Sequence, residues 1–135
     1  MKLLENKVAI ITGAGPGTGR ATATLLAKEG ARAVVSDISE KAGNAAADEI
    51  RKAGGEAFFV KADSSNAADN ETLVRETVKK YGALHIAVNN AGIGGPLALS
   101  GDYPLDGWQK VIDINLSGVF YGLRYQLPAM QATGG

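Results

Sequence analysis

The chain has 135 residues, with 14 basic and 14 acidic side chains, 18 glycines, one histidine and no cysteine. This length predicts one domain, residues 1–135, and the lack of cysteine excludes a thiol nucleophile and a Cys/His zinc site, so we expect no metal. The formal net charge of zero disfavours a nucleic acid partner, and no apolar run reaches membrane-spanning length, which predicts a soluble, cytoplasmic protein.

Short runs rich in β-branched residues alternate with longer stretches of helical periodicity, a pattern typical of βαβ units around a parallel sheet. In chain order we expect a strand at Val8–Thr12, a helix over Gly19–Glu29, a strand at Ala33–Asp37, a helix over Ser39–Ala53, a strand at Phe58–Lys61, extending back to Glu56, a helix capped by Asn66 and ending at Tyr81, a strand at His85–Asn89 and a long helix over Leu105–Ala132. Glycines that follow the first three helices predict helix ends at Gly30, Gly54 and Gly82.

A glycine-rich turn separates the first strand from the first helix, with the sequence Thr12-Gly13-Ala14-Gly15-Pro16-Gly17-Thr18-Gly19. Glycine permits positive φ and close approach of a ligand, and the start of the next helix directs unpaired N–H groups at an anion. These features favour a pyrophosphate site over a plain glycine-rich connector. A P-loop is excluded because Arg20 stands where its lysine belongs, and the pattern G-x-G-x-x-G also fails.

The spacing that fits is T-G-x-x-x-G-x-G, on Thr12, Gly13, Gly17 and Gly19, and it disfavours a methyltransferase-like fold. This spacing resembles the short-chain dehydrogenase/reductase family, whose cofactor is a nicotinamide dinucleotide. Four more features match the family in chain order: Asp37 ending the second strand, Asp63 after the third, Asn89-Asn90-Ala91-Gly92 after the fourth, and Asn115 in the long helix. The resemblance implies an α/β fold with a doubly wound, Rossmann-like parallel sheet of four strands in order 3-2-1-4.

Asp37 lies 24 residues after Gly13, where the end of the second strand would meet the adenosine ribose of a dinucleotide. A carboxylate there accepts hydrogen bonds from the ribose hydroxyls and repels a 2′-phosphate, so we expect NAD in preference to NADP. The alternative interpretation of Asp37 is a helix-entry cap before Ser39, which is compatible with a ribose contact. The cofactor-binding residues implied by the resemblance are Gly13, Gly15, Pro16, Gly17, Thr18, Gly19, Asp37, Ile38, Ala62, Asp63, Ser64, Asn90, Ala91 and Gly92.

Asn115 matches the only catalytic position of the family that is present. The family's proton relay also uses a Ser and a Tyr followed four residues later by Lys, and none of the four tyrosines has that lysine. We therefore expect a chain truncated before the fifth strand and inactive by the family mechanism. Asn115 is equally well interpreted as a buried hydrogen-bonding residue.

The resemblance implies hydride transfer between NAD and a small-molecule alcohol or carbonyl substrate in the complete enzyme, with no nucleic acid or membrane partner. It also implies a homo-oligomer, because the long helix resembles one that packs between subunits. The alternative is a non-catalytic NAD-binding or interaction module, for which the bare edge of the fourth strand would offer a pairing surface.

Other polar and aromatic residues are interpreted as structural. His85 lacks an adjacent acid or nucleophile in the sequence, and Asn89 is expected to tie the fourth strand to its neighbours. Trp108, Tyr121 and Tyr125 are expected to pack along the long helix.

Overall fold

The computed structural model describes residues 1–134, so Gly135, the last residue of the predicted domain, lies outside the described residues. Its centre is a 4-stranded parallel sheet in the order β3-β2-β1-β4. The strands are β1 (Val8–Ile11), β2 (Arg32–Asp37), β3 (Glu56–Lys61) and β4 (Ile86–Val88). The predicted fold class and strand order are confirmed, with the first and last strands shorter than expected.

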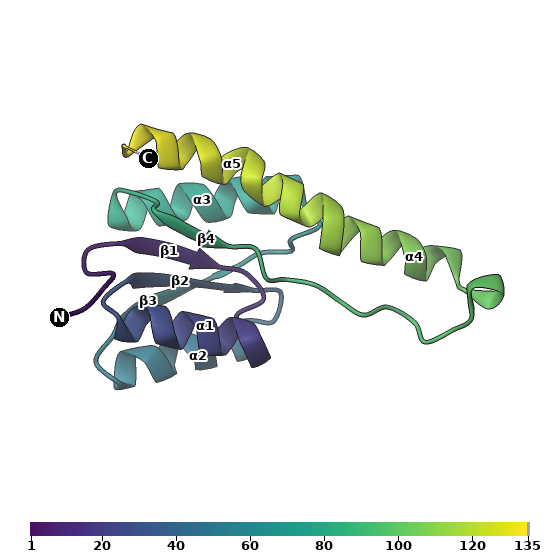
Figure 1. Cartoon of the computed structure of the whole chain (residues 1–135), viewed down its shortest axis with the longest axis horizontal. Coiled ribbons are helices and arrows are strands. Elements are labelled where there is room, and N and C mark those ends of the chain that lie inside the picture. The colour runs from purple at the N-terminus through teal and green to yellow at the C-terminus, as the bar shows by residue number, and fades with distance from the viewer. Residues whose placement is uncertain (135) are drawn as a thin grey trace.

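Helices cover both faces of the sheet, with α1 (Gly17–Lys28) and α2 (Glu40–Lys52) on one face and α3 (Ala67–Tyr81) and α5 (Gly118–Ala132) on the other (Figure 1). Strand β1 contributes to both interfaces. Ala9 and Ile11 belong to the apolar cluster beneath α1 and α2, whereas Ile10 belongs to the cluster beneath α3 and α5. A strand buried on both faces must be apolar throughout, which explains the uninterrupted run that identified it.

The predicted helix ends are confirmed. Gly30, Gly54 and Gly82 have φ angles of +100°, +88° and +80°, which close the three helices in the left-handed region. The Asn66 side chain accepts a hydrogen bond from the Asp69 N–H at 3.0 Å, as a helix cap does. No helix within residues 1–134 has the length and apolar character needed to span a membrane.

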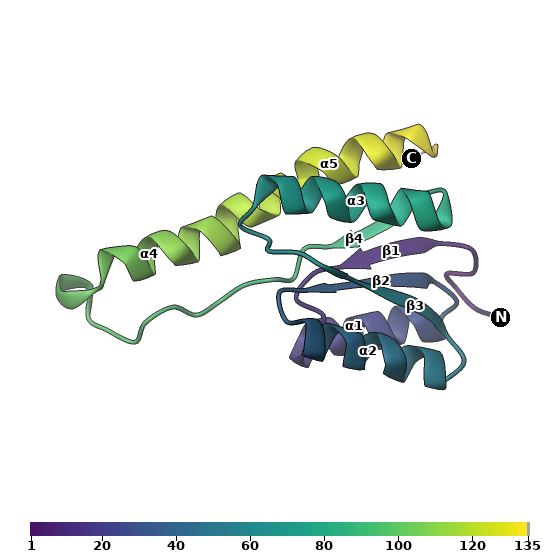
Figure 2. The same cartoon turned by 180° about the vertical axis from the view of Figure 1, so that it is seen from behind.

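The long helix is continuous but not regular. It consists of α4 (Leu105–Ile112), a π-helical segment η2 (Asp113–Ser117) and α5. Figures 1 and 2 show α4 projecting beyond the sheet, joined to it by a loop that contains the 3₁₀ turn η1 (Ser100–Asp102). The prediction that Trp108 packs is wrong within residues 1–134, since its side chain is 58% exposed on this projection. Tyr125 does pack, against the cluster beneath α3.

Candidate functional site

A cleft of about 430 Å³ lies where β1, β2, β3 and β4 give way to loops. In open parallel sheets, ligands bind at this edge, at the point where the strand order reverses, which here lies between β1 and β4. The lining residues are Gly13, Pro16, Thr18, Asp37, Ile38, Ala62, Asp63, Ser64, Asn90, Ala91, Gly92, Ile93 and Ile114. All residues predicted to bind the cofactor are therefore here except Gly15, Gly17 and Gly19, which shape the adjoining turn. Ile93 and Ile114 were not predicted.

The glycine turn requires glycine at its positions for two reasons. Gly13 and Gly17 have φ angles of +61° and +57°, in the region that other residues avoid. A Cβ atom on Gly19 would lie 2.3 Å from the Gly13 carbonyl oxygen. The turn is thus folded tightly on itself, and the first turn of α1 lies directly behind it.

Asp37 connects the second strand to the glycine turn. Its Oδ2 accepts a hydrogen bond from the Gly15 N–H at 3.0 Å, and its Oδ1 accepts one from the Ser39 N–H at 2.9 Å. Asp37 thus contacts the start of α2, but the cap of this helix is Ser39 itself, whose hydroxyl accepts from the Ala42 N–H at 3.2 Å. Because a carboxylate offers about four acceptor directions, each oxygen keeps capacity for a further donor from the cleft.

The charge of the cleft is negative. Asp37 and Asp63 are the only ionisable residues of its lining within residues 1–134. Arg20, the basic residue of the first helical turn, instead pairs with Glu49 on α2, where its Nε lies 2.9 Å from the carboxylate. The lining therefore disfavours a further anionic group beside Asp37.

Asn90 fastens the end of β4 to the glycine turn. Its Nδ2 donates to the carbonyl oxygens of Thr12 and Gly13 at 3.1 and 3.2 Å. In return, Thr12 Oγ1 accepts hydrogen bonds from the N–H groups of Asn90 and Ala91 at 3.0 and 3.1 Å. Thr12 was predicted only as part of the glycine motif, so its bridging function is a finding of the structure.

The wall formed by the loop after β3 is held by local hydrogen bonds. Asp63 Oδ1 accepts from Ser65, at 2.9 Å from its N–H and 2.7 Å from its hydroxyl. The Ser64 carbonyl accepts from the buried Asn70 side chain at 3.0 Å. Gly118 packs on the same carbonyl, which a Cβ atom would approach to 2.8 Å. Helix α5 therefore supports this wall closely.

Asn115 lies in the π-helical segment, a feature frequent at functional sites. Its Oδ1 accepts from the Ile93 N–H and its Nδ2 donates to the Ile93 carbonyl, both at 2.9 Å. These contacts agree with the hydrogen-bonding interpretation of Asn115, but the burial expected with that interpretation is wrong, because Asn115 is exposed. The side chain thus pairs with both backbone groups of Ile93, in the loop that follows β4, as a neighbouring strand would.

Two further residues have structural partners. His85 Nδ1 accepts a hydrogen bond from the Val8 N–H at 3.0 Å, which confirms the structural interpretation of this histidine. Asn89, expected to tie the fourth strand to its neighbours, ties it to α5 through Gln126. Gln126 was not predicted, although a lone amide on the apolar side of a helix is a detectable signal.

Comparison with known proteins finds relatives named as dehydrogenases. The family model described as short chain dehydrogenase matches residues 7–135. A cyclohexanol dehydrogenase from Acinetobacter sp. (strain SE19) is 47% identical over 131 residues, which cover 97% of this chain and 52% of the relative. A 3beta-hydroxysteroid dehydrogenase from Mediterraneibacter gnavus is 40% identical over 135 residues, covering 100% of this chain and 49% of the relative.

A solved structure extends the likeness to the fold. The crystal structure of a hydroxysteroid dehydrogenase from Escherichia coli matches with a TM-score of 0.92 and 38% sequence identity. The match covers 98% of this chain and 55% of that one. The chain thus spans about half the length of the curated relatives it matches.

Proposed function

The chain belongs to the short-chain dehydrogenase family, and we propose that it forms the cofactor-binding part of an NAD-dependent oxidoreductase that transfers hydride between NAD and an alcohol or carbonyl substrate. The observation that carries this proposal is the cleft itself, in which a glycine turn and the carboxylate of Asp37 meet at one edge of the sheet. The names of the relatives, a cyclohexanol and a hydroxysteroid dehydrogenase, support the substrate class.

The residues of the cleft fit a dinucleotide. A Cβ atom on Gly13 would lie 2.9 Å from Ala91 Cα, and one on Gly15 would lie 2.9 Å from Asp37 Oδ2, so only glycine leaves this cradle open. The unpaired N–H groups at the start of α1 suit a pyrophosphate. When bound, NAD would supply the nicotinamide ring that gives or takes the hydride.

The other parts of the dinucleotide have matching surfaces. Asp37 would accept hydrogen bonds from the ribose hydroxyls, and the exposed Ile38 beside it offers an apolar surface for the adenine ring. Asp63 and Ser64 lie along the same wall, where the adenine amino group would find a carboxylate acceptor. Asn90, Ala91 and Gly92 would pass beside the adenosine ribose.

We propose NAD over NADP on electrostatic grounds. At about 4 Å, one unit of like charge costs roughly 1 kcal/mol in water and roughly 4 kcal/mol at an effective dielectric of 20. The 2′-phosphate of NADP would meet Asp37 with no basic residue of the lining, within residues 1–134, to offset it.

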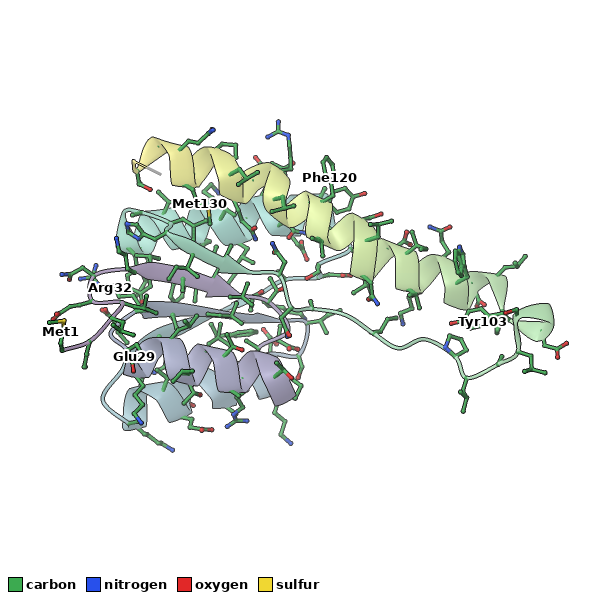
Figure 3. All side chains as sticks on the ribbon, in the orientation of Figure 1. Met1, Glu29, Arg32, Tyr103, Phe120 and Met130 are labelled. Carbon is green, nitrogen blue, oxygen red and sulfur yellow. The ribbon has the colours of Figure 1, made fainter. Side chains whose placement is uncertain are left out.

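We also propose a homo-oligomer built on the long helix. Leu116, Phe120, Leu123 and Leu127 recur at helical spacing and are all exposed. Figure 3 shows Phe120 on the side of the helix that is turned away from the sheet. A contiguous apolar stripe of this kind is typical of a protein interface.

The second candidate is an NAD-binding or interaction module without catalysis. It is favoured by the geometry of Asn115, whose amide is occupied by the Ile93 backbone. Within the described residues, β4 also pairs on one side only, with β1. Such an edge is open to pairing with another chain.

Calorimetric titration with NAD and NADP tests the proposal, followed by a turnover assay with cyclohexanol as a simple secondary alcohol. We expect saturable NAD binding, weaker NADP binding, and no turnover by the 135-residue chain, because none of its tyrosines is followed four positions later by lysine. An absence of NAD binding would refute the cofactor assignment. Robust turnover by a chain of verified intact mass would refute the expected inactivity.

A further inference from the structure

Asn89 and Gln126 form a reciprocal pair of amide hydrogen bonds between β4 and α5. Asn89 Nδ2 donates to Gln126 Oε1 at 2.9 Å, and Gln126 Nε2 donates to Asn89 Oδ1 at 2.8 Å. Gly122 permits this approach, since a Cβ atom there would lie 2.6 Å from Asn89 Oδ1. The helix and the end of the strand are therefore joined by a specific polar contact.

The burial of this pair makes its geometry demanding. Gln126 is 1% exposed, and its helical neighbours Tyr125, Ala129 and Met130 pack on the apolar cluster beneath α5. A buried amide without partners costs about 1 to 3 kcal/mol, so an apolar residue at this position would be the simpler packing solution. Because each amide satisfies the other at two points, each also fixes the position of the other.

The pair stands at one end of the segment that lines the cleft. Asn89 begins the stretch that continues through Asn90, Ala91 and Gly92 to Ile93, and this last residue is held by Asn115. The long helix is thus hydrogen-bonded to both ends of the segment 89–93, which forms one wall of the cleft.

We propose that Gln126 is a positioning residue for the nucleotide cleft: through Asn89 it sets where the segment Asn90–Gly92 passes beside the bound dinucleotide. The inference rests on the function proposed above. Gln126 does not line the cleft, and both of its amide hydrogen bonds join it to Asn89, so we infer that it acts on the nucleotide through Asn89.

The test compares Gln126→Met, which keeps the length of the side chain but removes its amide, with the unaltered 135-residue chain. We expect the Kd for NAD to rise by about threefold to tenfold, measured by calorimetry at a temperature where both proteins are fully folded. We also expect the Asn90 and Ala91 amides, which donate to Thr12 Oγ1, to exchange with solvent faster by a similar factor. Should this variant fail to fold, Gln126→Asn withdraws the amide by one methylene and gives the same comparison.

Thr77→Val is the matched control. Thr77 is also fully buried, and its hydroxyl donates only within α3, to the Leu73 carbonyl at 2.8 Å. We expect it to lower global stability while leaving the NAD Kd unchanged. The proposal would be overturned by two results together. The NAD Kd of Gln126→Met would lie within twofold of that of the unaltered chain, and the exchange of the Asn90 and Ala91 amides would rise no more than that of the amides paired between β1 and β2.

The two proposals fail in different ways. If the unaltered chain binds no NAD, the proposed function is refuted, and the amide exchange rates alone test whether Gln126 positions the segment Asn90–Gly92. If the unaltered chain binds NAD and Gln126→Met binds it equally well with unchanged exchange, only the positioning is refuted.

Discussion

Replacing Asp37 by Asn removes the charge that faces the ribose while leaving a similar shape. The amide oxygen of the new side chain can still accept from the Gly15 N–H, which Asp37 Oδ2 now accepts at 3.0 Å. Charged acceptors contribute about 1 kcal/mol more than neutral ones, so we expect the NAD Kd to rise about fivefold. The variant should keep its fold, because the glycine turn retains this hydrogen bond; the new Nδ2 cannot accept from the Ser39 N–H as Asp37 Oδ1 does, but the Ser39 side chain still caps α2.

The same substitution should raise affinity for NADP relative to NAD. Removing a like charge about 4 Å from the 2′-phosphate relieves roughly 1 kcal/mol in water and roughly 4 kcal/mol at an effective dielectric of 20. The ratio of the NADP Kd to the NAD Kd should therefore fall by at least about fivefold. Calorimetric titration of both nucleotides measures it, and added salt should shrink the difference because it screens the repulsion.

Asp48→Asn is the control for charge alone, since Asp48 is an exposed residue of α2 that pairs with Arg51. We expect its NADP to NAD ratio to match that of the unaltered chain. If Asp37→Asn leaves this ratio within twofold of the original, the electrostatic account of cofactor choice is wrong.

Three further substitutions test the structure. Gly19→Ala places a Cβ atom 2.3 Å from the Gly13 carbonyl oxygen, so we expect a loss of about 1 to 3 kcal/mol in stability, measured by urea unfolding, and a weaker NAD complex. His85→Ala leaves the buried Val8 N–H without its acceptor at 3.0 Å and should lower stability by about 1 to 3 kcal/mol without changing the NAD Kd. Tyr81→Phe removes a buried hydroxyl that has no hydrogen-bond partner within residues 1–134, so urea unfolding should show stability unchanged or raised by up to about 1 kcal/mol. Burial raises the pKa of Tyr81, so the folded state disfavours ionisation of its hydroxyl. The unaltered chain should therefore lose stability as the pH rises above the ordinary tyrosine pKa of about 10. Tyr81→Phe lacks the hydroxyl and should not show this loss.

A specific result would contradict each of these expectations. A Gly19→Ala chain as stable as the original would show that the turn tolerates a side chain. An altered NAD Kd in His85→Ala would show that the amino ends of the strands communicate with the cleft. A clearly destabilised Tyr81→Phe would mean that the hydroxyl has a stabilising partner.

The sheet and the cleft could be predicted because local signals agree there. The apolar run Val8–Ile11 is a strand buried on both faces, and the glycines after each helix adopt the positive φ that their positions suggested. The cleft residues could be gathered because the carboxyl ends of parallel strands meet at one edge. Asp37 followed from its place at the end of β2.

The long helix was predicted less well because helical spacing does not identify what covers each face. Its apolar stripe suggested packing for Trp108, yet α4 reaches beyond the sheet and leaves that side chain exposed. The exposure of Asn115 and the π-helical turn around it also follow from tertiary geometry. The pairing of Gln126 with Asn89 joins residues far apart in sequence, and neither amide alone indicates its partner.

We propose above all that this chain binds NAD in the cleft at the carboxyl edge of its sheet. The most direct measurement is an NMR titration of the isotopically labelled 135-residue chain with NAD, following every backbone amide. We expect saturable shifts concentrated in the glycine turn and in the segments that line the cleft, with little change in α4. An absence of saturable shifts, or shifts confined to residues outside the cleft, would contradict it.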